Sequence, residues 1–268
     1  LVAGGIGITP LLSMLRHAVL GPAPGWFIAG WAVAGLGVIT KGVGFLPLLV
    51  LVPFAVLVRR GWPAPVPGVG RLSLAGVVAM LVAISLWFVP MMVATSAGGD
   101  LLAYRNEILF KQTVTRYADA WHHHEPLWYY FVNIIPLFWL PLTALVPWLW
   151  PRWRAALRER DTFTTVLLAW VVIVVVFFTF STGKRGVYGL PAVPALWAAL
   201  VRHLGESPAA CALLAGIEMP SSGGAPLAPG VKERYLQLTG RRIHEGYGLS
   251  EAASTTHMTP LHKSSPPG

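Results

Sequence analysis

The sequence has few charged residues, few acids and a single cysteine. Only 12% of its 268 residues are Asp, Glu, Lys or Arg, about half the share usual in soluble domains. An ordinary single-core soluble protein is therefore not expected, and the 55% hydrophobic content excludes a disordered chain. Cys211 has no second cysteine to pair with, which excludes an internal disulfide and a metal cage built from thiolates.

The charge that is present is mostly positive. Lys and Arg number 20 against 11 acids, a formal net charge of +9. The basic residues sit at the ends of apolar runs and form no stripe on a polar segment, so a nucleic-acid partner is not expected and anionic lipid is. The chain begins at Leu1 with neither Met nor a charged leader, and we expect it to be a fragment with no readable signal peptide.

Long apolar runs predict an all-α polytopic membrane protein of about six transmembrane helices. The runs are Trp26–Thr40, Gly42–Val58, Ser73–Ala94, Leu127–Trp150, Phe163–Phe180 and Val187–Val201. A bilayer needs about 20 apolar residues, which Ser73–Ala94 and Leu127–Trp150 satisfy best. A buried soluble strand is the alternative for the β-branched stretch Val171–Phe178, but its length and neighbours favour a helix.

Arginine placement predicts the orientation. Two connections are arginine-rich and are expected to face the cytoplasm; they contain Arg59, Arg60 and Arg71, and Arg152, Arg154, Arg158 and Arg160. The loop 95–126 between them is richer in acids and is expected outside, on the same side as Lys41 and the Lys184–Arg185 pair. Six spans then place both termini in the cytoplasm.

The end of the outer loop gathers imidazoles, aromatics and one acid. It reads Trp121-His122-His123-His124-Glu125-Pro126-Leu127-Trp128-Tyr129-Tyr130. Cations with aromatic neighbours at a membrane face suit a phosphate-bearing lipid. One of the histidines could ligate a metal with Glu125 or Glu107, although adjacent side chains rarely converge on one ion. An interfacial loop that uses these residues only as anchors is the alternative.

Residues 25–203 resemble the aminoarabinose-transferase-like members of the protein mannosyltransferase superfamily, which have a GT-C fold. The matching stretches are Gly35-Leu36-Gly37-Val38-Ile39-Thr40-Lys41-Gly42, the loop from Trp121 to Tyr130, and Ser181-Thr182-Gly183-Lys184-Arg185-Gly186-Val187-Tyr188. The resemblance implies a multi-pass protein of the bacterial inner membrane with a partial GT-C fold. It also implies transfer of a sugar from a polyprenyl-phosphate donor to an extracytoplasmic glycolipid acceptor such as lipid A.

The same resemblance implies site residues. Lys41, Lys184 and Arg185 would bind the lipid phosphate. The substrate cleft would be lined by His122, His123, His124, Glu125 and Tyr129, with His123 as a ligand for a divalent metal. The catalytic Asp of the family belongs to an outer loop that follows the first span, and no residue here matches that motif, so the catalytic residue is unknown.

Each flank resembles a different family. Residues 1–20 read as strand, glycine turn and helix, with Gly4, Gly5, Gly7 and Thr9 in the turn. They resemble the nucleotide-binding lobe of ferredoxin-reductase-like flavoenzymes, but the segment is too short for an NAD(P) site to be expected. The alternative is an apolar helix lying against the membrane.

The tail, residues 206–268, is expected to be a small soluble α/β-like fragment. Its motifs, Ser222-Gly223-Gly224-Ala225-Pro226-Leu227 and Glu245-Gly246-Tyr247-Gly248-Leu249-Ser250-Glu251, resemble the adenylate-forming acyl-CoA synthetases over about 210–262. The resemblance implies that Tyr247 and Ser250 bind the nucleotide and Glu251 binds Mg²⁺, with ATP and Mg²⁺ as cofactors if the tail is functional. The alternatives to a glycosyltransferase are therefore an AMP-forming ligase fragment and an inactive composite reading frame.

Overall fold

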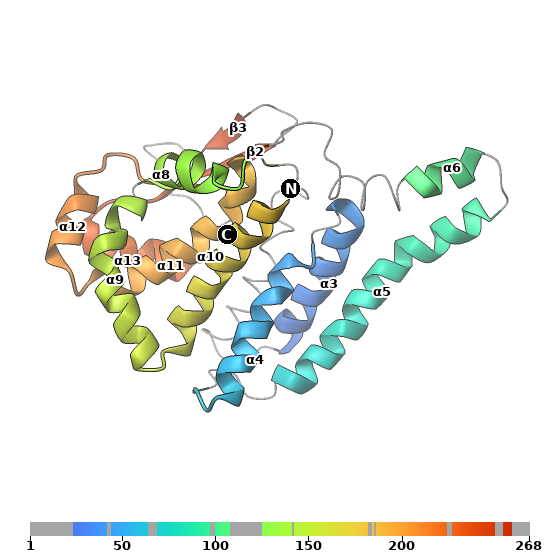
Figure 1. The fold of residues 1–268 in the computed structure, drawn as a ribbon, viewed down its shortest axis with the longest axis horizontal. Helices are drawn as coiled ribbons and strands as arrows, with labels where there is room; N and C mark the ends of the chain where they lie inside the picture. Colours follow the sequence, from blue (N-terminus) through green and yellow to red (C-terminus); the bar gives the residue numbers. More distant parts are fainter. Residues whose placement is uncertain are drawn as a thin grey trace.

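The computed structural model is mostly helical, with one small sheet towards the C-terminus (Figure 1). It describes residues 24–41, 44–63, 69–96, 100–107, 125–140, 142–181, 184, 186–223, 227–249 and 254–258. The first helices are α3 (Pro24–Lys41), η1 (Leu46–Val50), α4 (Leu51–Arg59), α5 (Val69–Thr95) and α6 (Asp100–Asn106). The remaining ones are η3 (Tyr130–Ile134), α8 (Ile135–Phe138), α9 (Leu142–Arg158), α10 (Thr162–Phe180), η4 (Gly186–Ala192), α11 (Val193–Leu204), α12 (Pro208–Ala215) and α13 (Pro229–Thr239).

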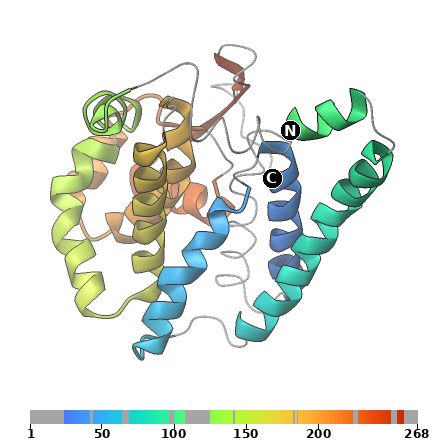
Figure 2. The same ribbon diagram turned by 45° about the vertical axis from the view of Figure 1, so that its right-hand side comes forward.

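Helices α3 and α5 form a close parallel pair at one side of the molecule, with α9 and α10 at the other side (Figure 2). Small residues make the close approach possible. A Cβ atom added at Gly35 would lie 2.7 Å from the Met80 carbonyl oxygen, and one added at Gly76 would collide with the Trp31 ring. Such small-residue contacts are typical of helices that pack inside a membrane, where close backbone approach supplies the van der Waals energy.

Two of the predicted spans are helices that are long and apolar enough to cross a bilayer. Ser73–Ala94 lies within α5, and Phe163–Phe180 coincides with most of α10. The β-branched stretch Val171–Phe178 is helical, which confirms the helix over the strand. Helix α10 begins at an Asp161 cap whose carboxylate accepts hydrogen bonds from the Phe163 and Thr164 amides, at 3.1 and 3.4 Å.

The other apolar runs fold into shorter pieces. The run Leu127–Trp150 is divided among η3, α8 and α9, with a turn at Trp139–Leu140. The run Val187–Val201 is divided between η4 and α11. Prolines lie at two of the breaks, Pro136 in the first turn of α8 and Pro191 within η4, and each lacks the amide hydrogen that a continuing helix needs, whereas α9 accommodates Pro147 and Pro151 in its interior. The predicted count of six spans is therefore not confirmed beyond α5 and α10.

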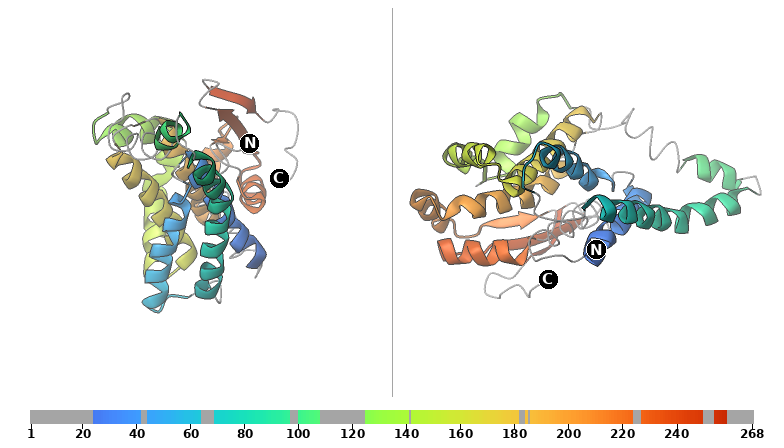
Figure 3. Two further views of the ribbon diagram at one scale, coloured as in Figure 1. Left: turned by 90° about the vertical axis from the view of Figure 1, so that its right-hand side faces the viewer. Right: turned by 90° about the horizontal axis from the view of Figure 1, so that it is seen from below.

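Most of helix α11 is buried. Nine of its residues are buried, including Trp197, Leu200 and Leu204, none of which has exposed surface. Helices α9 and α10 cover one side, and α13 covers the other, where the Trp197 and Tyr235 rings meet edge to face at 5.3 Å. Figure 3 (right) shows α11 and α13 side by side. Apart from Arg202 and His203 in its last turn, the helix is apolar all round, as expected for such a central position.

The tail contains the small α/β fragment that the sequence predicts. Strand β1 (Ser221–Gly223) pairs in parallel with β2 (His244–Leu249), and β3 (Ser254–Met258) pairs antiparallel to β2. Helix α13 connects β1 to β2 and ends at Gly240, whose φ of 68° is a left-handed conformation that glycine adopts without strain.

Candidate functional site

The strongest candidate site lies where the polypeptide leaves α10. Lys184 follows the C-terminal end of α10 by four residues and is only 5% exposed. Its Nζ donates a hydrogen bond of 2.8 Å to the carbonyl oxygen of Glu125. Two predicted site residues, 59 positions apart in the sequence, are therefore brought into direct contact.

Packing between η3 and η4 holds this contact in place. The Tyr129 amide donates to the Pro126 carbonyl at 3.1 Å, so the chain turns directly after Glu125. Tyr129 is half-buried, and its ring meets the buried Tyr130 ring edge to face at 5.4 Å. In the segment that bears Lys184, the Tyr188 ring of η4 stacks on the Phe178 ring of α10, with ring centroids 5.0 Å apart. The Phe178–Tyr188 contact joins α10 to η4 on either side of Lys184, and η3 packs against η4.

The end of α10 is anchored independently. The indole nitrogen of the fully buried Trp170 donates a hydrogen bond of 2.9 Å to the Pro191 carbonyl oxygen. This bond ties η4 to α10. Pro191 lies within η4 and lacks the amide hydrogen that a regular helical hydrogen-bond pattern needs. The Trp170–Pro191 bond therefore holds together α10 and η4, the two elements on either side of Lys184.

The chemistry available at this position is anion binding. A lysine ammonium carries three N–H donors. Within the described part of the chain, the Glu125 carbonyl uses one of them. A phosphate oxygen is a suitable acceptor for the others, and a charge-assisted bond of this kind is about twice as strong as one between neutral groups. A buried ammonium also needs such partners, because burial of an unpaired charge is unfavourable.

Several other predicted site residues lie outside the described residues or have side chains that are not described. They are Gly4, Gly5, Gly7, Thr9, Lys41, His122, His123, His124, Arg185, Tyr247, Ser250 and Glu251. Their roles remain predictions. Over the described ranges no group of three His, Cys, Asp or Glu side chains could hold a metal ion, and both residues predicted as metal ligands fall outside those ranges.

The arginine-rich connections lie at the opposite end of α10 from Lys184. The end of α4, the start of α5 and the α9–α10 turn all lie at the bottom of Figures 1 and 2. The Thr162 hydroxyl at the start of α10 donates to the Pro63 carbonyl at 2.7 Å, which joins two of these connections directly. Helix α10 has 19 residues and is therefore about 28 Å long, close to the thickness of a bilayer core.

The junction with the tail is also at the arginine-rich end. Arg202 forms an ion pair with Asp161 at 3.1 Å, and Arg152 forms one with Glu206 at 3.0 Å. The His203 ring nitrogen Nε2 lies 3.3 Å from the Thr164 hydroxyl. Helix α11 therefore runs antiparallel to α10 and returns the chain to the side on which α10 begins.

The tail contains polar groups that the sequence reasoning missed. The Glu245 carboxylate accepts hydrogen bonds of 2.7 Å from the Leu227 amide and from Lys232 Nζ, which ties β2 to the start of α13. Ser222 Oγ and His244 Nδ1 are buried on neighbouring strands and have no hydrogen-bond partner among the described residues. The sequence motifs contain Ser222 and Glu245, but sequence spacing alone indicates neither the pairing of β1 with β2 nor the Lys232–Glu245 contact.

Among the described residues of the tail, Tyr235 is the group with a clearly shifted pKa. Burial against Trp197 raises the pKa of Tyr235 to about 12, and the nearby Thr239 hydroxyl and Arg241 charge offset part of the rise. Its hydroxyl has no hydrogen-bond partner in the described part of the chain. The residue therefore acts as a core side chain that stays neutral at ordinary pH.

Two kinds of known protein match the chain. It is 30% identical over 187 residues to undecaprenyl phosphate-alpha-4-amino-4-deoxy-L-arabinose arabinosyl transferase 2 of Pseudomonas fluorescens strain Pf0-1, covering 67% of this chain and 32% of that protein. The corresponding transferase of Serratia proteamaculans strain 568 is 29% identical over 189 residues (69% and 31%), and that of Enterobacter sp. strain 638 is 31% identical over 188 residues (68% and 31%). The chain thus spans about a third of the length of these curated relatives.

A family model described as AMP-binding enzyme matches residues 182–268. Both of these resemblances, to the aminoarabinose transferases and to the adenylate-forming enzymes, are therefore confirmed as similarities. The second match begins before the predicted boundary at 206, so it includes Lys184 and the whole of α11. No solved structure matches the chain.

Proposed function

We propose that the helical part of this chain is a donor-binding portion of a membrane glycosyltransferase that takes its sugar from a polyprenyl phosphate. The observation that carries the proposal is the contact between buried Lys184 and the Glu125 carbonyl, which lie in two stretches that resemble the transferase family in sequence. The similarity to undecaprenyl-phosphate aminoarabinose transferases supports the donor class. The proposed role is binding of the donor phosphate by Lys184, Lys41 and Arg185.

The positions of the charges support an orientation in which α10 crosses the membrane, with Lys184 on one side and the arginine-rich connections on the other. Lys184 and the arginine-rich connections are separated by the length of α10, and positive charge in short loops favours the cytoplasmic side. We therefore place the donor phosphate at the extracytoplasmic face of the inner membrane, with a glycolipid such as lipid A as the acceptor. The return of α11 to the arginine-rich end supports a cytoplasmic tail.

Deprotonation of an acceptor hydroxyl needs a general base, and cations alone cannot provide one. The described outer residues assigned to the donor site are Lys184, Glu125 and Tyr129, of which Glu125 contributes its main-chain carbonyl to the contact with Lys184. The proposal therefore assigns donor recognition to these residues and assigns the chemical step to none of them.

Binding of undecaprenyl phosphate to the full chain in detergent tests the proposal, with undecaprenol as the ligand that lacks only the phosphate. Native mass spectrometry should show retention of the phosphate form. A Lys184→Met variant should bind it about 10- to 100-fold more weakly, because a charge-assisted hydrogen bond contributes about 1.5–3 kcal/mol.

The matched control is Lys232→Met, which removes a lysine from the ion pair with Glu245 in the tail. Its affinity for undecaprenyl phosphate should equal that of the unaltered chain. Equal affinity of the unaltered chain for undecaprenol and undecaprenyl phosphate would contradict the proposal. Undiminished binding by a folded Lys184→Met variant would contradict the role of Lys184.

The AMP-binding match favours a second candidate, nucleotide binding by the tail. The parallel pairing of β1 with β2 places the motifs that contain Ser222 and Glu245 side by side, and Tyr247 follows in β2. Photo-crosslinking of the full chain with an azido-ATP in the presence of Mg²⁺ should label residues near Tyr247. Labelling should fall in a Ser250→Ala, Glu251→Gln variant if these residues hold the nucleotide.

Failure of the chain to bind either ligand would favour the composite reading frame. Sequencing of the source locus across residues 19–25 and 203–211 then decides between the two remaining interpretations. A continuous gene would support a real chain of unknown activity, and a break at either junction would assign a function to the middle segment alone.

A further inference from the structure

The arginine-rich end of the helices has many more cations than the described residues can neutralise. Six arginines are exposed there and form no ion pair with any described residue: Arg59, Arg60, Arg71, Arg154, Arg158 and Arg160. Among the described carboxylates at this end, Asp161 and Glu206 are already paired with Arg202 and Arg152. Glu159 is exposed and unpaired, and it is therefore the remaining counter-charge in these ranges.

These arginines come from three separate parts of the chain. Arg59 and Arg60 end α4, Arg71 is in the first turn of α5, and the other three belong to the end of α9 and the turn into α10. The hydrogen bond from Thr162 to Pro63 holds the α4 and α10 connections together. All three parts lie at the same end of the helices (Figures 1 and 2), and we call this cationic end the arginine end and define it by these six residues.

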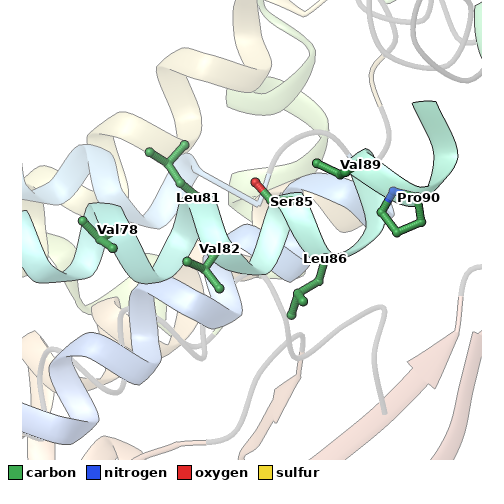
Figure 4. Close-up of a pocket in the computed structure, with 7 residues that line it drawn as sticks. All are labelled: Val78, Leu81, Val82, Ser85, Leu86, Val89 and Pro90. Carbon is green, nitrogen blue, oxygen red and sulfur yellow. The ribbon is translucent and has the colours of Figure 1, made fainter. Parts of the chain in front are cut away.

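The surface directly above the arginine end is apolar. Helix α5 exposes Leu74, Val78, Leu81, Val82, Leu86, Val89 and Val93, each at least half exposed. Figure 4 shows the side chains from Val78 to Pro90 along this helix, where Ser85 is the one polar residue among those labelled. An exposed apolar surface next to exposed positive charge is complementary to an anionic phospholipid, whose apolar acyl chains adjoin a charged headgroup.

We propose that the arginine end binds the headgroups of anionic phospholipids, with the acyl chains packed along the apolar face of α5. Charge complementarity selects this occupant over a neutral lipid, because each arginine near an anionic membrane surface strengthens binding by about fivefold. A protein partner would have to cover a surface whose apolar part extends along most of a membrane-length helix, so lipid is the favoured occupant.

The test uses the full chain purified in a neutral detergent and titrated with phosphatidylglycerol or with phosphatidylcholine of the same acyl chains. Bound lipid is counted by native mass spectrometry. The chain should retain phosphatidylglycerol in preference to phosphatidylcholine, and the preference should weaken in high salt, which screens exposed charges. Inorganic phosphate at the same concentration should not displace the lipid.

An Arg59→Gln, Arg71→Gln variant should bind phosphatidylglycerol about 25-fold more weakly, with little change for phosphatidylcholine. The matched control is Arg105→Gln, Arg242→Gln, which removes the same charge from α6 and from the tail and should change the affinity less than threefold. An Arg158→Gln, Arg160→Gln variant provides a second pair from a different connection, so that a folding failure of the first leaves the proposal testable.

Three results would overturn the proposal. The first is equal retention of the two lipids by the unaltered chain, and the second is an equal loss in the control variant. The third is displacement of phosphatidylglycerol by inorganic phosphate, which would indicate a simple anion site. None of these results bears on undecaprenyl-phosphate binding at Lys184, which lies at the other end of α10.

Discussion

The burial of Trp197 makes a sharp prediction about how the tail and the helical part are joined. The indole has no exposed surface and meets the Tyr235 ring of α13 edge to face, and its helix α11 packs against both α10 and α13. Trp197→Ala should therefore destabilise the tail together with α11. Large-to-small substitution of a buried tryptophan lowers the free energy of unfolding by about 3–5 kcal/mol, and the lost edge-to-face pair with Tyr235 accounts for about 0.5–1.5 kcal/mol of this effect.

Limited proteolysis of the full chain in detergent measures this effect locally. If the tail opens before it is cleaved, a loss of about 3 kcal/mol raises its cleavage rate roughly 100-fold. Trp148→Ala is the matched control, because Trp148 lies on α9 and is 45% exposed, so its removal leaves little cavity. Cleavage of the tail in this control should stay within a few-fold of the unaltered chain.

An unchanged cleavage rate in Trp197→Ala would refute this reasoning. It would mean that α11 is an independent span with a loosely attached tail, as the sequence-based boundary at 206 assumes. Equal acceleration in both tryptophan variants would indicate a general loss of helix packing and would equally contradict a specific joint between α11 and α13.

Three further predictions concern other parts of the chain. Burial raises the pKa of Tyr235 from its usual 10 to about 12, so the folded tail should lose stability between pH 10 and 12, where the tyrosine of the unfolded chain ionises first. Tyr235→Phe should reduce this alkaline loss of stability, measured as melting temperature against pH. At pH 7 the same substitution should be neutral or slightly stabilising, because the Tyr235 hydroxyl has no hydrogen-bond partner among the described residues. Gly35→Ala should destabilise the α3–α5 pair by about 1–3 kcal/mol, since the new Cβ would meet the Met80 carbonyl at 2.7 Å, whereas Gly70→Ala, with open space around it, should not; equal melting temperatures would contradict the close packing. Lys41→Ala should weaken undecaprenyl-phosphate binding in the same titration as Lys184→Met, and unchanged binding would remove Lys41 from the proposed site.

Composition and run length were enough to predict the helical class and the apolar helices within α5 and α10. These features depend on local hydrophobicity, which a single sequence displays directly. The small α/β tail was predicted from motif resemblance. Run length misled at Leu127–Trp150, where hydrophobicity is continuous but proline interrupts the helical ladder, so that the run becomes η3, α8 and α9.

For the candidate site, the sequence supplied the residue types, and their grouping came from motif resemblance. It could place Lys184 and Glu125 on the same side of the membrane because loop charge reports orientation. It could not show that Nζ of one meets the carbonyl of the other, because a contact across 59 residues depends on how η3 packs against η4. The same holds for the six arginines of the arginine end, which come from three connections.

The sequence by itself therefore determined what can be read within one segment: apolar length, loop charge, turn residues and motif spacing. Only the tertiary structure showed that α11 is a core helix packed between α10 and α13. That outcome depends on whether α13 covers the face that a bilayer would otherwise cover. Hydrophobic residues can be covered equally well by lipid tails or by apolar side chains, so hydrophobicity alone does not indicate which of the two covers α11. The packing of Tyr235 against Trp197 shows that protein covers this face.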